Sequence, residues 1–205
     1  MNGYHFNAES ARIDTAWPNL PQLKTLRLEN CVLSGEDLIQ ILSRTTTKLQ
    51  SLALFAVRHP FRNNELPSFF VDSLEELWIE NSGPISFESH FLSYSGLRSL
   101  HLDWHLFVKM VAFVPPNLLD ISIAVPNYVA SRGPNYGWFE AELERTSIVL
   151  PQLRVIRVLG QRGYHLLDNE MELLRNLGAR GTKLVVELVH RGEGEHSLVL
   201  VRAIC

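Results

Sequence analysis

Residues 23–33 read Leu23-Lys-Thr-Leu26-Arg-Leu28-Glu-Asn-Cys31-Val-Leu33. The stretch opens with a hexapeptide that has leucine at its first, fourth and sixth positions. The same hexapeptide pattern, with Ile or Val in place of some leucines, recurs at starts Leu49, Leu74, Leu97, Leu118 and Leu153. One copy is a weak signal, because any amphipathic strand can produce it. Six copies in one chain of 205 residues indicate an internal repeat.

The spacing of the copies predicts the fold class. Their starts lie 26, 25, 23, 21 and 35 residues apart, and four of these five spacings match the ~20–29 residues of a leucine-rich repeat unit. Side chains alternate along a strand, so the fourth and sixth positions point to one face, where only stacking against neighbouring units can bury them. We therefore expect an α/β leucine-rich-repeat solenoid of six to seven irregular repeats. A short parallel sheet would line its concave side, with helices or loops on its convex side.

The rest of the chain is expected to complete a single domain over residues 1–205. We divide it into an N-terminal segment (1–19), repeats (20–160) with a loop insertion (127–147), and a C-terminal repeat and cap (161–205). Helical return segments are expected after Ser34 and at 168–177 before Gly178, and residues 106–114 form a short apolar return segment that a Pro-Pro pair stops. Two strand-like runs, 184–190 and 197–204, predict a terminal hairpin that caps the sheet.

Composition narrows the classes of partner. The chain carries 19 Lys+Arg against 22 Asp+Glu, a formal net charge of −3, so it has no cationic surplus for nucleic acid. No apolar run approaches the ~18 residues of a membrane span, and the start lacks the pattern of a signal peptide. The 2 cysteines, Cys31 and Cys205, make no disulfide framework. We expect no nucleic-acid or membrane partner, and an intracellular protein of the cytoplasm or nucleus.

The candidate binding site is the solvent-facing side of the repeat strands. Positions three, five and seven of each copy face this side, and their middle is aromatic and acidic. We predict a protein-binding surface made of Arg27, Phe55, Glu76, Trp78, Glu80, His101, Asp103, Asp120 and Arg157. Tryptophan is the residue most enriched at interface hot spots, and the acidic centre favours a protein partner with a basic or mixed surface. The alternative is that the N-terminal segment or residues 136–139 cover Trp78.

One family resemblance extends this hypothesis. Residues 20–31 (Leu-Pro-Gln-Leu-Lys-Thr-Leu-Arg-Leu-Glu-Asn-Cys) and 150–158 (Leu-Pro-Gln-Leu-Arg-Val-Ile-Arg-Val) resemble the ribonuclease-inhibitor-like leucine-rich repeats of fungal F-box proteins. The resemblance implies the substrate-recognition arm of a cullin–RING ubiquitin ligase, in which an N-terminal F-box docks a Skp-type adaptor. About 20 residues precede the first copy, and they lack the Leu-Pro-x-Glu-type opening of an F-box. An adaptor is therefore expected only if an F-box lies outside this chain; otherwise the protein is a stand-alone repeat scaffold.

A contrasting hypothesis places chemistry at His101-Leu-Asp103-Trp-His105. Strand alternation would bring His101 and Asp103 to one face as a His–carboxylate pair, and His105 could complete a metal site. The chain has no Gly-x-Ser-x-Gly nucleophile motif, and residues 178–183 lack the spacing of a phosphate-binding loop. We expect a non-enzymatic protein with no catalytic residue, metal or cofactor, in which Cys31 serves packing.

Overall fold

The structure is a computed structural model. It describes residues 3–7, 23–32, 49–57, 73–80, 95–110, 114–125, 150–160, 168–178, 181–189 and 199–204. The chain divides into two compact units, Met1–Arg98 and Ser99–Cys205, each described below by itself. Within the described residues, the first unit contains only strands. Within the same residues, the second unit contains strands and two helices.

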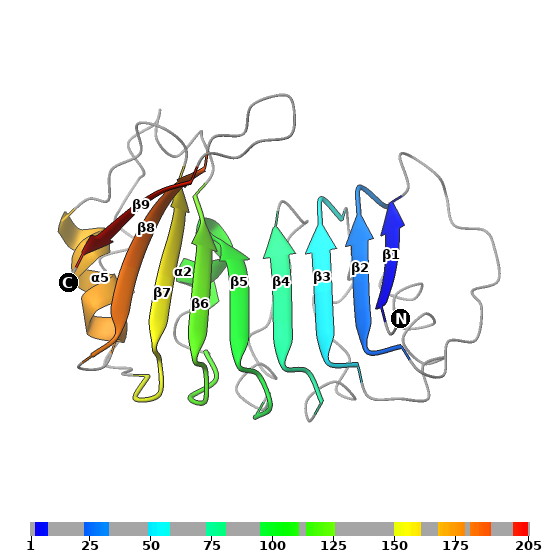
Figure 1. The fold of residues 1–205 in the computed structure, drawn as a ribbon, viewed down its shortest axis with the longest axis horizontal. Coiled ribbons are helices and arrows are strands. Elements are labelled where there is room, and N and C mark those ends of the chain that lie inside the picture. The colour runs from blue at the N-terminus through cyan, green and yellow to red at the C-terminus, as the bar shows by residue number, and fades with distance from the viewer. Residues whose placement is uncertain are drawn as a thin grey trace. The chain divides into compact units, whose positions relative to one another are not determined.

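Within its described residues, the first unit contains four parallel strands. In order they are β1 (Gly3–Asn7), β2 (Thr25–Glu29), β3 (Ser51–Phe55) and β4 (Glu76–Glu80), and each pairs with the next (Figure 1). The last three occupy positions three to seven of the first three hexapeptides. The strands therefore form where the leucine pattern predicts them.

Strand register aligns equivalent positions of successive hexapeptides. Leu26 pairs with Leu52 and Leu52 with Leu77, while the sixth-position residues form a second row of Leu28, Leu54 and Ile79. All six side chains are at most 1% exposed. Each row is a continuous apolar ladder, because one strand's leucines lose contact with water only against the leucines of the next strand.

Backbone hydrogen bonds recur at both ends of these strands. At the start, the Gln50 N–H donates to the Lys24 carbonyl oxygen and the Glu75 N–H to the Gln50 carbonyl oxygen, each at 2.8 Å. At the end, the Asn30 N–H donates to the Phe55 carbonyl oxygen and the Ala56 N–H to the Glu80 carbonyl oxygen, each at 2.9 Å. These two residues leave their strands with φ of 51° and 50°, the left-handed region that asparagine tolerates and alanine does not favour.

The described part of the second unit contains four parallel strands and one antiparallel strand. They are β5 (Ser99–Asp103), β6 (Asp120–Ala124), β7 (Val155–Gly160), β8 (Lys183–Val189) and β9 (Val199–Ile204). Strands β5 to β8 pair in parallel, and β9 runs antiparallel to β8. The predicted terminal hairpin is therefore confirmed. Strands β5, β6 and β7 begin at the third positions of the last three hexapeptides.

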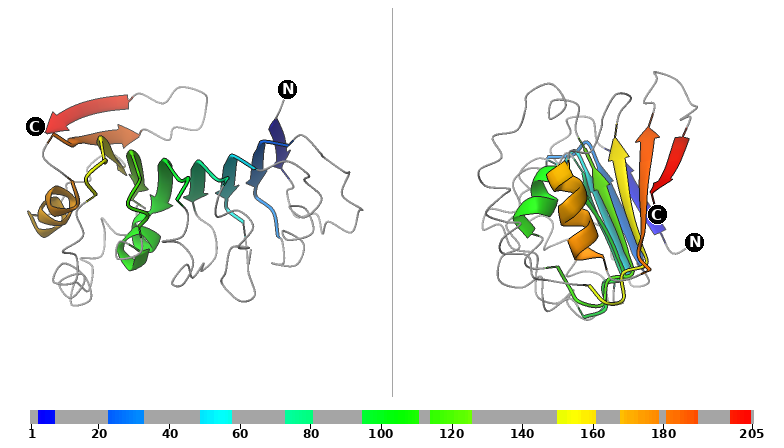
Figure 2. Two further views of the ribbon diagram at one scale, coloured as in Figure 1. Left: turned by 90° about the horizontal axis from the view of Figure 1, so that it is seen from below. Right: turned by 90° about the vertical axis from the view of Figure 1, so that its left-hand side faces the viewer.

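Two helices lie on one face of the strands of the second unit (Figure 2). Helix α2 (Trp104–Met110) follows β5 directly and buries Trp104 and Phe107, whose ring centroids are 5.8 Å apart. The helix overlaps the predicted apolar return segment 106–114 and begins two residues before it. Helix α5 (Asp168–Leu177) has the predicted bounds and buries Leu174 and Leu177 at 1% exposure each.

Gly178 ends α5 as predicted, for an additional reason. Its N–H donates to the Leu174 carbonyl oxygen at 3.2 Å. A Cβ at this position would lie 3.0 Å from Cβ of Thr182, whose hydroxyl donates to the Leu153 carbonyl oxygen at 2.8 Å. A side chain at this position would therefore crowd Thr182, which would have to shift by a few tenths of an ångström.

Strand β1 was not predicted. We assigned residues 1–19 only as an N-terminal segment, yet Tyr4 and Phe6 take the register positions of Leu26 and Leu28. The leucine pattern could not reveal this strand, because aromatic residues stand at the two positions that are leucine in β2. The helix expected after Ser34 and the insertion at 127–147 lie outside the described residues.

The leucine ladder predicts that substitutions at neighbouring positions of β3 change the free energy of unfolding by very different amounts. Replacement of Leu52 by Ala should lower the free energy of unfolding by about 2–5 kcal/mol, because Leu52 is fully buried between two strands. Ala53→Ser, one residue on and facing outward, should change it by less than about 0.5 kcal/mol. Urea unfolding followed by circular dichroism measures both, and equal losses would contradict the assigned faces.

The backbone at Ala56 predicts a stabilising substitution. Ala56→Gly should raise the free energy of unfolding by up to about 1 kcal/mol, because glycine adopts positive φ without steric cost. Ala53→Gly, in the extended part of the same strand, should lower it by about 0.5–1 kcal/mol. The same urea titration compares the two variants, and a loss of stability in Ala56→Gly would refute the backbone argument.

Candidate functional site

The first unit carries a surface of aromatic and charged side chains on the face opposite its leucines. We define the Trp78 surface as Arg27, Glu29, Phe55, Glu76, Trp78 and Glu80, from strands β2, β3 and β4. Trp78 is 39% exposed, and among the described residues only Trp78 and Val32 are large exposed hydrophobic side chains. The exposure predicted for Trp78 is thus present.

Arg27 anchors one end of this surface. Its Nε donates a hydrogen bond of 2.6 Å to Oε1 of Glu29, and its Nη2 forms an ion pair with the same oxygen. The Arg27 guanidinium carbon also lies 4.4 Å from the centroid of the Phe55 ring. One cation therefore contacts both a carboxylate and an aromatic face, which fixes the direction of a long side chain.

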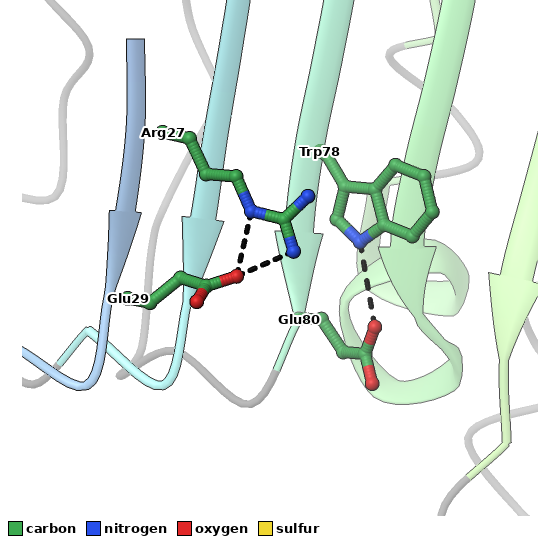
Figure 3. Close-up of polar contacts among 4 residues, drawn as sticks. All are labelled: Arg27, Glu29, Trp78 and Glu80. Carbon is green, nitrogen blue, oxygen red and sulfur yellow. Dashed lines mark hydrogen bonds and ion pairs between the residues drawn. The ribbon is translucent and has the colours of Figure 1, made fainter. Parts of the chain in front are cut away.

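Trp78 lies at the other end, joined through Phe55. The Phe55 and Trp78 ring centroids are 5.3 Å apart with an interplanar angle of 43°. The Trp78 Nε1–H donates to Oε2 of Glu80 at 3.4 Å, as the dashed line in Figure 3 marks. Arg27/Glu29 on β2 and Trp78/Glu80 on β4 occupy the same two register positions, each pair made of an N–H donor and a glutamate acceptor.

These contacts orient the side chains more than they stabilise the fold. An aromatic pair contributes about 0.5–1.5 kcal/mol beyond its buried area, and an exposed cation–π contact about 0.5–1 kcal/mol. Each is smaller than the contribution of one buried leucine of the ladder. The result is an aromatic surface whose side chains are oriented by their contacts with one another.

Two residues of the predicted surface are corrected by the structure. Glu80 and His101 were expected to face solvent, but they are only 6% and 3% exposed. Strand alternation gives the side of the sheet on which a side chain emerges, and its neighbours then decide how much water reaches it. The indole of Trp78 is one such neighbour of Glu80.

The nine predicted residues separate between the two units. Arg27, Phe55, Glu76, Trp78 and Glu80 belong to the first unit, and Glu29 joins them although our prediction omitted it. The signal for Glu29 was present, because it stands two residues after Arg27 on the same strand face. His101, Asp103, Asp120 and Arg157 belong to the second unit. There, Nη1 of Arg157 lies 3.8 Å from Oδ1 of Asp120, and both side chains are more than a third exposed.

The alternative site at His101, Asp103 and His105 does not gather as a metal centre. His101 and Asp103 lie on β5, whereas His105 is the second residue of α2. Within the ranges that the structure describes, which include all three residues, no group of three or more His, Cys, Asp or Glu side chains is placed to hold a metal ion. Among the described helices, none is long and apolar enough to cross a membrane.

Comparison with known proteins adds no relative. Neither protein-family models, nor curated proteins, nor solved structures match this chain.

Cys31 is a packed thiol, as predicted. It follows β2 at the ninth position of the first copy, where the second copy has Val57, and the two residues are 1% and 0% exposed. Burial raises the pKa of Cys31 to about 11, and the nearby negative charge of Glu29 raises the pKa further while a backbone hydrogen bond lowers it. The thiol therefore stays protonated at neutral pH, where only a thiolate is nucleophilic.

This pKa predicts the reactivity of Cys31. In a Cys205→Ser variant, alkylation of Cys31 by iodoacetamide at pH 8.5 should be about 50–100-fold slower in the folded than in the urea-unfolded protein. Because the folded pKa lies above the ordinary value of 9.0, stability should also fall as pH rises from about 9 to about 11. The double variant Cys31→Ala, Cys205→Ser supplies the background rate. Comparable rates in the two states would refute the packing role.

Proposed function

We propose that this chain is a leucine-rich-repeat protein whose role is to bind another protein. The proposal for the fold is supported by the hexapeptide spacing, the register of equivalent leucines and the recurrence of backbone bonds. The same bonds appear in the second unit, where the Arg154 N–H donates to the Leu119 carbonyl oxygen and the Val125 N–H to that of Leu159. A shared backbone pattern at equivalent positions is what stacking of one structural unit produces.

The observation that carries the proposed function is the exposed, pre-oriented Trp78. A tryptophan at 39% exposure gains burial when a partner covers it, and its contacts with Phe55 and Glu80 already limit its motion. The surface offers charged and hydrogen-bonding groups around an aromatic centre, which is the composition of an interface hot spot. It has no nucleophile–base pair of the kind that catalysis would use. We infer a non-enzymatic interaction module.

The resemblance to fungal F-box proteins supports a more specific role. In that role the Trp78 surface recognises a substrate protein, and an F-box outside this chain attaches it to a ubiquitin ligase through a Skp-type adaptor. A stand-alone scaffold would use the same surface without the adaptor. The two differ in which second protein accompanies the partner.

Site-specific photo-crosslinking tests the proposed function. A photoreactive amino acid replaces Thr25, an exposed residue of β2 on the same face as Trp78, and the chain is irradiated in a fungal lysate. A crosslinked protein should be recovered, and Trp78→Ala should reduce its yield at least 10-fold, since central interface aromatics contribute about 2 kcal/mol or more. Val32→Ser is the matched control, because it removes the other exposed hydrophobic side chain of the same unit.

The outcomes separate the alternatives. Loss in Trp78→Ala with retention in Val32→Ser supports the interaction surface, whereas equal recovery from both variants overturns it. In a parallel purification of the uncrosslinked chain, an adaptor and cullin together with the partner support the ligase role. Their absence assigns the chain to a scaffold.

A further inference from the structure

We propose that the Trp78 surface recognises an arginine side chain of its partner, stacked on the indole of Trp78 with its charge facing Glu76. This inference rests on the proposed function and specifies the chemistry of the same site. It follows from three features of the described residues: a guanidinium already bound on this surface, the accessibility of Trp78 and Glu76, and the local charge.

The surface already binds one guanidinium from its own chain. Arg27 sits 4.4 Å from the Phe55 centroid while Glu29, on the same strand, neutralises its charge. The Phe55 ring and the Glu29 carboxylate, on the same side of the sheet, both contact this guanidinium. It shows that this sheet spacing accommodates a planar cation between a ring and a carboxylate.

The same two components are accessible on β4. Trp78 is 39% exposed, and tryptophan has the strongest cation–π attraction of the aromatic residues. Glu76 is exposed on the same face of the strand, two residues before Trp78, so the two Cα atoms are about 7 Å apart. Within the part of the chain that the structure describes, Glu76 forms no ion pair. A guanidinium over the indole would reach this carboxylate.

The charge of the surface favours a cation over an anion. The Trp78 surface has one arginine and three glutamates, a net formal charge of −2, and Arg27 is already balanced by Glu29. An incoming carboxylate or phosphate would meet Glu76 at the exposed edge of the site. An incoming arginine would meet opposite charge there and a π face beside it.

Peptide titration tests the inference with the whole chain. The probe is the synthetic peptide Gly-Arg-Gly-Arg-Gly-Arg-Gly, and the reference peptides carry Lys, Gln or Glu in place of Arg. Binding is followed by NMR on the indole N–H resonance of Trp78, which a Trp78→Phe variant identifies. The Arg peptide should shift this resonance and bind at least 3-fold more tightly than the Lys peptide, because a guanidinium stacks on an indole and an ammonium does not.

Two charge reversals distinguish a site from general attraction. Glu76→Lys should weaken the binding of the Arg peptide at least 5-fold, whereas Glu75→Lys should weaken this binding less than 2-fold. Both changes alter the net charge equally at exposed neighbouring positions, and Glu75 is engaged by Gln50 rather than facing Trp78. Amide spectra of both variants should overlay with the wild type away from β4, which shows that the fold is retained.

Three results would overturn the inference. They are equal effects of the two reversals, no shift of the Trp78 resonance by the Arg peptide, or tighter binding of the Gln or Glu peptide. The crosslinking experiment remains independent of them. A crosslink that depends on Trp78, combined with any of these results, retains the interaction surface and rejects arginine as its ligand.

Discussion

The structure depends on one constraint: the leucines of a strand are buried only when the next strand aligns in register. Leu52 lies between Leu26 and Leu77, and none of the three reaches water to more than 1% of its surface. A slip of one residue would move a strand's leucines to the outer face and its polar residues inward. Because this cost applies at every pair, the register propagates from strand to strand within each unit.

The same register orders the outer face. Once the leucines align, the residues between them also fall into rows, so Arg27, Ala53 and Trp78 share one row and Glu29, Phe55 and Glu80 the next. Small Ala53 stands between the two large side chains. Contacts between these two rows contribute about 1 kcal/mol each, compared with several for a buried leucine. The composition of the outer rows is therefore largely independent of what stabilises the fold.

Much of this arrangement followed from local patterns. The six hexapeptides predicted the six strands that contain them, and the apolar spacing with Gly178 predicted both ends of α5. Strand β1 was not predicted because the residues in register with Leu26 and Leu28 are Tyr4 and Phe6, which the leucine pattern excludes. The burial of His101 and Glu80 was not predicted, because strand alternation gives only the side of the sheet on which a side chain lies. The solvent exposure of that side chain depends on neighbours that are distant in sequence.

The sequence by itself determined which residues face the core and which face outward, because that choice depends only on alternation along each strand and on the avoidance of water by leucine. Tertiary structure alone decided which outward residues meet. Arg27 and Phe55 are 28 positions apart in the chain, and only the pairing of β2 with β3 places the guanidinium on the ring. Likewise, Glu80 is only 6% exposed and accepts a hydrogen bond from the Trp78 indole, a consequence of side-chain packing that no spacing rule contains.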